Sequence, residues 1–379
     1  MPKQKLVENK LFEKVKFVNL LALELGEFFK EREELAKLLI IALMSRQHVF
    51  ILGPPGTAKS AMVRAVASMF DAKSFEILLT RYTTPEELFG PVDLMAYEKG
   101  EYKRVTVNML PEAVTAFLDE IFKANSAILN SLLWITNERL YLDRGKIVSV
   151  PLDTLIGASN ELPEDEKELA ALYDRLLIRY QVEYIKKDEN FREMLLSEDK
   201  FTPKRIASTD DLKFLQKMVA NVDVTPVMDS IVELRRNLRN EGIIASDRRF
   251  KQAISVIKAH ALFNSRTVAS TDDLRVLQHI MWDEPDQIRT VRKVIMDAVD
   301  PFARKVMEYR DILNDYKNQL QGKIDPVDSQ EIMTKLKTIE NEIKDLIKMS
   351  LSSGKDTAEL DEILSEIQEL KVSMLDKMF

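Results

Sequence analysis

Eight consecutive residues, Gly53-Pro-Pro-Gly-Thr-Ala-Lys-Ser60, have the composition of a phosphate-binding loop. They follow the short apolar run His48–Leu52 and precede a segment, 59–70, whose apolar residues recur at helical spacing. Between a strand and a helix, such a loop turns its backbone N–H groups toward phosphate oxygens, and the positive end of the helix reinforces them. Lys59 would then reach the β- and γ-phosphates, and the Ser60 hydroxyl would bind Mg²⁺.

The match to the usual pattern is incomplete, because Ala58 stands where the strict motif has a glycine. The alternative interpretation is a Gly-Pro turn that happens to precede Lys-Ser. The strand–loop–helix context favours nucleotide binding. The residues expected to contact the nucleotide are Gly53, Pro54, Pro55, Gly56, Thr57, Ala58, Lys59 and Ser60.

A second group of candidates is the acidic pair Asp119-Glu120, which follows the apolar run Val114–Leu118. Two adjacent carboxylates at the end of a buried strand are costly unless they are used. We expect Asp119 to help hold Mg²⁺ through water and Glu120 to polarise the attacking water as general base. An apolar strand followed by two acids is a weak signal by itself, and a preceding phosphate loop makes it a strong one.

The elements that position these residues alternate between strand-like and helical patterns. Residues 11–45 predict two helices with a break near Gly26, and further strands are predicted at Phe75–Thr80, Val114–Leu118, Thr154–Ala158 and Gln181–Ile185. Alternation of nearly continuous apolar strands with helices is typical of a parallel sheet covered by helices. The predicted fold class is therefore α/β. Two hairpin-like insertions, near 94–107 and 139–150, interrupt the pattern.

The chain of 379 residues is too long for one compact domain. We expect an α/β nucleotide-binding core at 1–190, a helical lid at 198–282 and a long-helix bundle or coiled-coil arm at 284–379. From about residue 188 every segment is predicted to be helical. Ala207-Ser-Thr-Asp-Asp-Leu212 and Ala269-Ser-Thr-Asp-Asp-Leu274 nearly repeat each other. We interpret them as two similar helix caps rather than a duplicated unit.

Composition excludes several kinds of site. There is no cysteine, which rules out disulfides, thiolate metal sites and a cysteine nucleophile, and three histidines leave little for a histidine-rich metal centre. The net charge of −7 argues against a chain coated in nucleic acid. The longest apolar run, Leu38–Met44, is far shorter than a membrane span, and the N-terminus lacks a secretory apolar segment. We therefore expect a cytoplasmic protein.

Taken together, these motifs resemble an AAA+ ATPase, specifically the MoxR family, and are closest to its RavA branch. The match runs in family order through about two thirds of the chain, and relatives of this branch often carry alanine at the Ala58 position. Besides the two motifs above, the matching segments are Arg81-Tyr-Thr-Thr-Pro-Glu-Glu-Leu-Phe-Gly90, Leu110-Pro-Glu-Ala113, Ala127-Ile-Leu-Asn-Ser-Leu-Leu133, Asn137-Glu-Arg139, Ala158-Ser-Asn-Glu-Leu-Pro163, Ala171-Leu-Tyr-Asp-Arg175 and Ser246-Asp-Arg-Arg-Phe250.

The resemblance implies roles for three further residues. Asn160 resembles the sensor that positions the attacking water, although it could instead be a turn residue that caps the next segment. Arg175 resembles the arginine finger that one ring subunit inserts into its neighbour's ATP site, with Arg179 as the second candidate. Arg248 resembles the second sensor, which reaches from the lid to the phosphates. Arg249 is the alternative for that role. An arginine at any of these positions could also be a surface ion pair.

The resemblance also gives meaning to other segments. Phe28–Leu35 aligns with the region that borders the adenine. The two insertions match loops that can project toward the pore of a ring ATPase, and we take Lys99, Tyr102, Arg144 and Lys146 as candidates for substrate or partner contact. The tail departs from the family, since bacterial RavA relatives interrupt their helical bundle with a β-rich domain.

The sequence thus predicts an ATP- and Mg²⁺-dependent ring ATPase that remodels a protein partner. The ring is expected to be homo-oligomeric and hexameric, and the resemblance suggests a von Willebrand factor A-domain protein as partner, with no membrane insertion. One alternative is a nucleic-acid motor of helicase type, which the acidic charge disfavours. Another is an ATP-gated structural scaffold with little turnover.

Overall fold

The computed structural model describes residues 2–101, 103–143, 146–162, 167–198, 200–299, 301–319, 326–352 and 357–378. They divide into two compact units, Met1–Ile295 and Met296–Phe379. Residues 284–295, which the sequence assigns to the helical arm, therefore belong to the first unit. Among the described residues, no helix is both long and apolar enough to cross a membrane.

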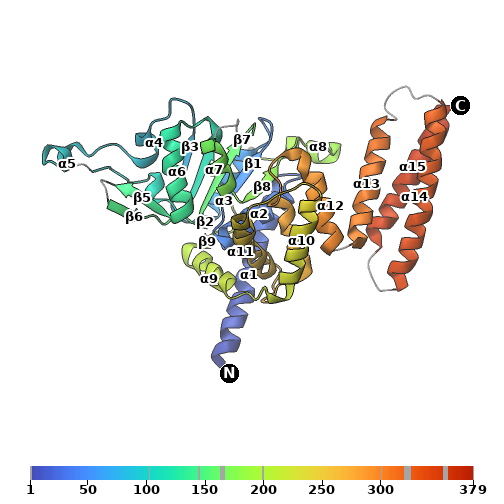
Figure 1. Cartoon of the computed structure of the whole chain (residues 1–379), viewed down its shortest axis with the longest axis horizontal. Coiled ribbons are helices and arrows are strands. Elements are labelled where there is room, and N and C mark those ends of the chain that lie inside the picture. Colours follow the sequence, from blue (N-terminus) through green and yellow to red (C-terminus); the bar gives the residue numbers. More distant parts are fainter. Residues whose placement is uncertain are drawn as a thin grey trace. The chain divides into compact units, whose positions relative to one another are not determined.

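The first unit is built on a five-stranded parallel sheet with the order β3-β4-β7-β1-β8 (Figure 1). This confirms the predicted α/β core. Its strands are β3 (Ser74–Leu78), β4 (Thr115–Asp119), β7 (Thr154–Ser159), β1 (Val49–Leu52) and β8 (Ile178–Gln181). Two small sheets accompany it, formed by β2 (Phe70–Asp71) with β9 (Ala207–Ser208), and by β5 (Leu140–Asp143) with β6 (Lys146–Ser149).

Both faces of the large sheet are buried, as parallel sheets require. Alternate residues such as Phe50, Leu118 and Leu155 pack in one apolar core with side chains of α6 and α7. The residues between them, such as Phe117 and Ile156, face α2 and α3. The helices of the core are α1 (Pro2–Phe28), α2 (Glu33–Ser45), α3 (Lys59–Ser68), α4 (Pro85–Phe89), α5 (Leu94–Glu98), η1 (Leu110–Glu112), η2 (Ile121–Lys123), α6 (Ser126–Glu138), α7 (Lys167–Arg175) and α8 (Asp188–Leu196).

A helical lid follows the core. The helices after β9 are α9 (Thr209–Ala220), η3 (Thr225–Val227), α10 (Met228–Asn240), α11 (Asp247–Phe263), η4 (Thr271–His279), η5 (Pro285–Gln287) and α12 (Ile288–Val299), whose residues from 296 on fall in the second unit. The two near-repeats are helix caps, as expected. The Ser208 hydroxyl accepts a hydrogen bond from the Asp211 N–H, and Ser270 forms a capping box with Asp273 at the start of η4.

The second unit contains three long helices, α13 (Pro301–Gln319), α14 (Pro326–Ser352) and α15 (Ala358–Met378). Apolar residues spaced three and four apart on each helix, among them Leu313, Ile343 and Ile367, form one buried core. The described part of this unit is entirely helical, as the sequence predicts.

Three details of the predicted elements are wrong. The first helical break lies at residues 29–32, and Gly26 is inside α1. The strand predicted at Gln181–Ile185 is β8, which ends where that range begins. The strands do not stop at residue 188, because β9 pairs with β2.

At the first predicted hairpin the chain forms α5, and an isolated bridge between Val92 and Arg104 joins the segments on either side of it. The second predicted hairpin is present as the antiparallel pair β5 and β6.

Candidate functional site

The candidate phosphate-binding loop, residues 53–60, joins the carboxyl end of β1 to α3. Gly53 packs so closely on the end of β8 that a Cβ atom there would lie 2.4 Å from the Val182 carbonyl oxygen. Ala58 has a left-handed backbone with φ of 63°, which favours the glycine of the strict motif. The loop therefore keeps the usual conformation with an alanine at the strained position. The turn at residues 29–32, within the expected adenine border, contacts the chain that follows β8, because Glu31 accepts hydrogen bonds from the backbone of Lys186 and Lys187.

The Lys59 side chain is buried against the loop that precedes it. Its Nζ donates to the carbonyl oxygens of Gly53 and Pro54, at 2.6 and 2.9 Å, and to Asn160 Oδ1 at 2.9 Å. Burial lowers the pKa of the Lys59 ammonium, and the charges of Asp119 and Glu120 oppose that shift. An ammonium group that is held by neutral oxygens and poorly solvated is prepared to exchange those partners for phosphate.

A hydroxyl and a carboxylate lie beside the loop in a geometry that suits a magnesium ion. Ser60 Oγ donates a hydrogen bond to Asp119 Oδ2 at 2.8 Å. Hard oxygen ligands of these two types, few in number and next to a phosphate site, are what Mg²⁺ uses when the remaining ligands are water and phosphate. The described residues contain no cluster of three or more side chains that would form an all-protein metal cage.

Glu120 and Asn160 meet in front of the same loop. Asn160 follows β7 directly, and its Nδ2 donates to Glu120 Oε1 at 2.5 Å. Glu120 has a left-handed backbone with φ of 52°, and Lys123 Nζ lies 3.3 Å from its other carboxylate oxygen. Asn160 thus contacts both Lys59 and Glu120. Parallel strands β1, β4 and β7 bring these groups together at their carboxyl edge, where α/β sheets bind their ligands.

Two of the predicted arginines lie at the opposite edge of the sheet. Arg175 ends α7, three residues before β8 begins, and its Nη1 donates to the Ala171 carbonyl oxygen of its own helix. Arg248, in the first turn of α11, donates a hydrogen bond to Asn137 at the end of α6. Because β8 runs parallel to β1, the residues before both strands share the amino edge.

The ion pair between Asp174 and Arg249, at 2.9 Å, brings their chain neighbours Arg175 and Arg248 close together. Burial lowers the pKa of the Arg175 guanidinium, and the charge of Arg248 lowers it further. Burial, together with the charges of Arg139 and Arg248, lowers the pKa of His48 to about 3. His48 immediately precedes β1, whereas Gly53 follows it. Arg175 and Arg248 therefore form a cationic pair at the amino edge of the sheet, whereas this subunit's own phosphate loop lies at the carboxyl edge.

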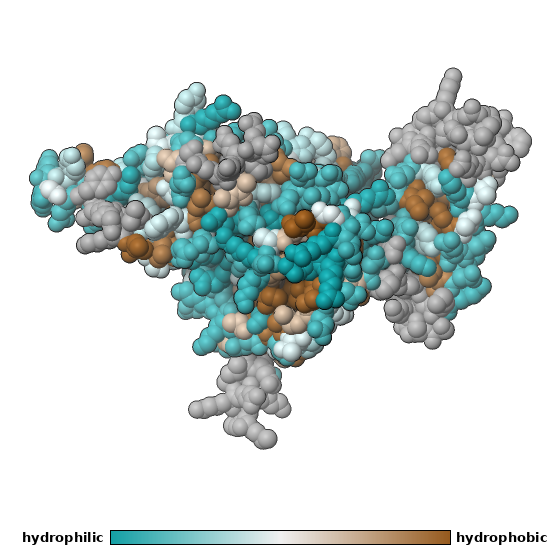
Figure 2. Space-filling view, in the orientation of Figure 1, coloured by the Kyte–Doolittle hydropathy of each residue, from teal (hydrophilic) through white to brown (hydrophobic). Residues whose placement is uncertain are grey.

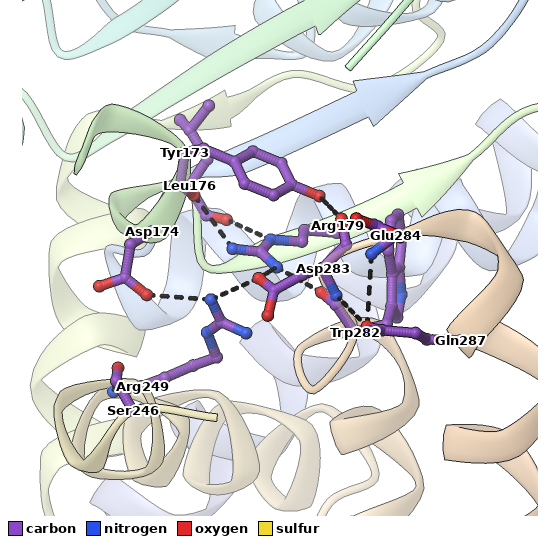
Figure 3. A network of polar contacts seen from close by, with 10 residues as sticks. All are labelled: Tyr173, Asp174, Leu176, Arg179, Ser246, Arg249, Trp282, Asp283, Glu284 and Gln287. Atoms are coloured by element: carbon purple, nitrogen blue, oxygen red, sulfur yellow. Dashed lines mark hydrogen bonds and ion pairs between the residues drawn. The ribbon is translucent and has the colours of Figure 1, made fainter. Parts of the chain in front are cut away.

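The alternative arginines, Arg179 and Arg249, are buried within the subunit (Figure 3). Arg179 is wholly inaccessible. Its guanidinium lies 3.9 Å from the centre of the Tyr173 ring, and its Nη1 lies 2.6 Å from Asp283 Oδ1. Arg249 pairs with Asp174 at 2.9 Å and with Asp283 at 2.8 Å. Neither side chain is on the surface where a neighbouring subunit could meet it.

The insertions lie at the periphery of the first unit. Figure 1 shows α5 at the end of an extension that projects away from the sheet. Leu94, Met95 and Tyr97 on this extension are largely exposed, and hydrophobic atoms are visible there and on the β5–β6 hairpin in Figure 2. Lys99 is exposed at the end of α5. Tyr102, Arg144 and the side chain of Lys146, the other contact candidates, lie outside the described residues.

Sequence reasoning missed the partners of the buried arginines. Asp283 accepts ion pairs from two of them, and Asp174 from one. Asp174 precedes Arg175 in the chain, and this adjacency was the local sign that Asp174 could belong to the site. Asp283 gave none, because its partners are 104 and 34 residues away.

The chain is similar to several known proteins and family models. Residues 16–220 match the family described as the MoxR domain in the MoxR-vWA-beta-propeller ternary systems, and residues 226–295 match an AAA lid domain. Two uncharacterised proteins of Methanocaldococcus jannaschii are 38% and 39% identical over 358 and 356 residues. These matches cover 92% and 91% of this chain, and 96% and 93% of those proteins.

More distant similarities point the same way. A MoxR-type chaperone of Mycobacterium tuberculosis is 29% identical over 197 residues, which cover 50% of this chain and 51% of that one. The crystal structure of a putative ATPase from Cytophaga hutchinsonii superposes with a TM-score of 0.64 at 19% identity, covering 79% of this chain and 99% of that one. This last likeness concerns the fold.

Proposed function

The chain belongs to the MoxR family of AAA+ ATPases, and we propose that it hydrolyses Mg-ATP at sites completed by a neighbouring copy in a ring. The observation that carries this proposal is the division of the candidate site between two edges of the sheet. The phosphate loop, Glu120 and Asn160 lie at the carboxyl edge, and Arg175 and Arg248 lie at the amino edge.

The separation is too large for one subunit to close. β1 has four residues, which at about 3.3 Å each put about 13 Å of strand between the two edges. That is longer than an arginine side chain. A neighbour that docks its amino edge on this carboxyl edge would supply the missing cations, and repeating that head-to-tail contact gives a ring when the rotation closes.

Each residue then has a distinct task. Lys59 binds the β- and γ-phosphates, and Ser60 and Asp119 would hold the metal, with Asp119 acting through water. When bound, Mg²⁺ neutralises charge on the phosphate oxygens. Glu120 accepts the proton of the attacking water, and Asn160 orients that water and the carboxylate. The neighbour's Arg175 stabilises charge that develops on the transferred phosphoryl group.

Arg248 is proposed to act as the second sensor for the same neighbouring site. It lies beside Arg175, and burial together with Arg248 already depresses the Arg175 pKa. Two guanidiniums held close together repel each other, and an anion of high charge placed between them relieves that repulsion. A triphosphate presented by the adjacent subunit has the required charge.

The wider biological role rests on the family. We propose a cytoplasmic hexamer that couples hydrolysis to chaperone-like remodelling of a protein partner, with a von Willebrand factor A-domain protein as partner. The family model's description and the similarity to a MoxR-type chaperone support this role. The motif resemblance favours placement near the RavA branch. The exposed apolar residues of the α5 extension are suited to protein contact.

The proposal is tested by ATP hydrolysis per protomer as protein concentration rises, with Glu120→Gln as the blank. We expect the rate per protomer to climb and then reach a plateau, because an isolated subunit has no neighbour to supply Arg175 and Arg248 to its phosphate loop. A rate above the blank that stays constant while light scattering shows dissociation into monomers would refute the shared site. No rate above the blank at any concentration would refute hydrolysis by this chain alone.

A further inference from the structure

An ion-pair network of two buried arginines and two partly exposed carboxylates joins the end of α7 to the start of α11 and to the turn before η5 (Figure 3). We use "ion-pair network" for its four charged members, Asp174, Arg179, Arg249 and Asp283. Asp283 Oδ1 is the shared acceptor, at 2.6 Å from Arg179 and 2.8 Å from Arg249, and Arg249 continues to Asp174 at 2.9 Å. The two positive charges are thus matched by two carboxylates.

The backbone of Asp283 is held from two further sides. Tyr173 Oη donates to the Asp283 carbonyl oxygen at 2.6 Å, and the Asp283 N–H donates to Gln287 Oε1 at 2.8 Å. Burial alone would raise the pKa of Asp283, but the Arg249 and Arg179 guanidiniums hold it below its ordinary value. The carboxylate therefore stays ionised and fixed at the centre of the network.

The network touches both arginines of the cationic pair through their chain neighbours. Asp174 immediately precedes Arg175 on α7, and Arg249 immediately follows Arg248 on α11. The Asp174–Arg249 ion pair therefore connects two elements, one of the core and one of the lid, at the positions next to the two functional side chains. This contact, together with the shared Asp283 carboxylate, links the chain segments that carry Arg175 and Arg248.

The placement of these two arginines needs support, because like charges resist being held together. The ion-pair network is also expected to add little net free energy to folding. Taking charges out of water costs several kcal/mol per ion, and well-packed apolar residues often serve as well or better. Such a network does provide directional contacts that fix the positions of two elements, which an apolar contact does less sharply.

We propose that Asp283 is a positioning residue that registers Arg175 and Arg248 for the neighbouring subunit's ATP. This inference rests on the proposed function, since it assigns a role to the shared site. Without the Asp283 carboxylate, Arg179 and Arg249 face each other with only Asp174 as counter-ion. Their repulsion would move α11 relative to α7 and displace the two arginines.

The test is the variant Asp283→Asn, with Asp286→Asn as the matched control. Asp286 is an exposed carboxylate three residues away, in η5. We expect Asp283→Asn to lower hydrolysis per protomer by about a hundredfold, the cost of a misplacement of about 1 Å. Affinity for a fluorescent ATP analogue should stay within about twofold, because the phosphate loop is untouched. Asp283→Glu, which restores the charge, should recover part of the rate.

Mixed assemblies separate positioning from a folding defect. Glu120→Gln subunits keep Asp283 and both arginines but cannot hydrolyse ATP. Added to Asp283→Asn subunits, they should restore hydrolysis at the intact phosphate loops of the latter. Restoration in the mixture, with loss in Asp283→Asn alone, supports the inference. Wild-type activity of Asp283→Asn, or loss that no mixture restores, would overturn it.

Failure of the proposed function would have a different signature. If Arg175→Ala retained full activity, no arginine would be needed from a neighbour, and the shared site itself would be refuted. If Arg175→Ala lost activity and Glu120→Gln restored it while Asp283→Asn behaved as wild type, the shared site would stand. Only the role of Asp283 would then fail.

Discussion

The sharpest consequence of the divided site concerns two inactive variants that should become active together. Arg175→Ala keeps its phosphate loop, Glu120 and Asn160, but presents no finger. Glu120→Gln keeps Arg175 but has no general base. The two changes lie at opposite edges of the sheet. One interface of a mixed ring can therefore combine an intact base from the first variant with an intact finger from the second.

The magnitude follows from the placement of the residues. An arginine finger is worth about 10³ to 10⁵ in rate, or about 4 to 7 kcal/mol of transition-state stabilisation, so each variant alone should run near the blank. In a random equimolar mixture about one half of the sites belong to Arg175→Ala, and about one half of those face a Glu120→Gln neighbour. About one quarter of wild-type activity should return, whatever the number of subunits.

The assay is steady-state phosphate release at fixed total protein while the ratio of the two variants changes. The rate should rise from the blank, peak at equal amounts and fall symmetrically. Mixing Glu120→Gln with Lys59→Ala is the control, because neither variant supplies an intact ATP site. If Arg175 acts on its own subunit's ATP, every mixture stays at the blank. That result, in rings verified to contain both variants, would refute the divided site.

Further predictions concern single residues. Lys59→Ala should lose binding of labelled ATP in equilibrium dialysis, since no other ammonium contacts the loop in the described structure, and unchanged affinity would contradict the assignment. Ser60→Ala should raise the Mg²⁺ concentration needed for half-maximal hydrolysis, which a magnesium titration measures. Ala58→Gly should remove a left-handed strain of about 1 kcal/mol, so the urea midpoint should rise or stay level with hydrolysis unchanged. The pKa of His48 in the folded protein is about 3, below the ordinary 6.5. Its contribution to stability is therefore complete above pH 6.5 and is lost as the pH decreases. The free energy of unfolding should therefore be about 2 kcal/mol lower at pH 5 than above pH 6.5. Urea unfolding at several pH values measures this loss, which should be smaller in His48→Asn.

Much of the candidate nucleotide site could be proposed from the sequence because its residues lie in short contiguous stretches. The dihedral angles of the loop from Gly53 to Ser60 depend on eight neighbouring residues and on the strand and helix that flank them. Asp119 ends β4 and Asn160 follows β7, and the ends of parallel strands meet at one edge of the sheet. A reader of the sequence who recognises the strands therefore knows that these side chains converge.

The errors arose where local pattern and tertiary contact disagreed. The segment Ile178-Arg-Tyr-Gln181 contains one charged residue, Arg179, and two residues with polar groups, Tyr180 and Gln181. The apolar pattern alone therefore placed the predicted strand after it. It is a strand through its parallel pairing with β1, and Arg179 within it is buried against Tyr173 and Asp283. Such partners, far away in the chain, leave no trace in a local window.

The sequence by itself determined the phosphate loop, the acidic pair, the α/β core and the helical tail, since periodicity and adjacent residues dictate those features. Only the tertiary structure decided which arginines are available. It buries Arg179 and Arg249 among carboxylates and leaves Arg175 and Arg248 together at the amino edge. The physical reason is strand order. Pairing β8 beside β1 in parallel places Arg175 at the amino edge, and the contact of α11 with α7 brings Arg248 there; both depend on the whole fold rather than on any one segment.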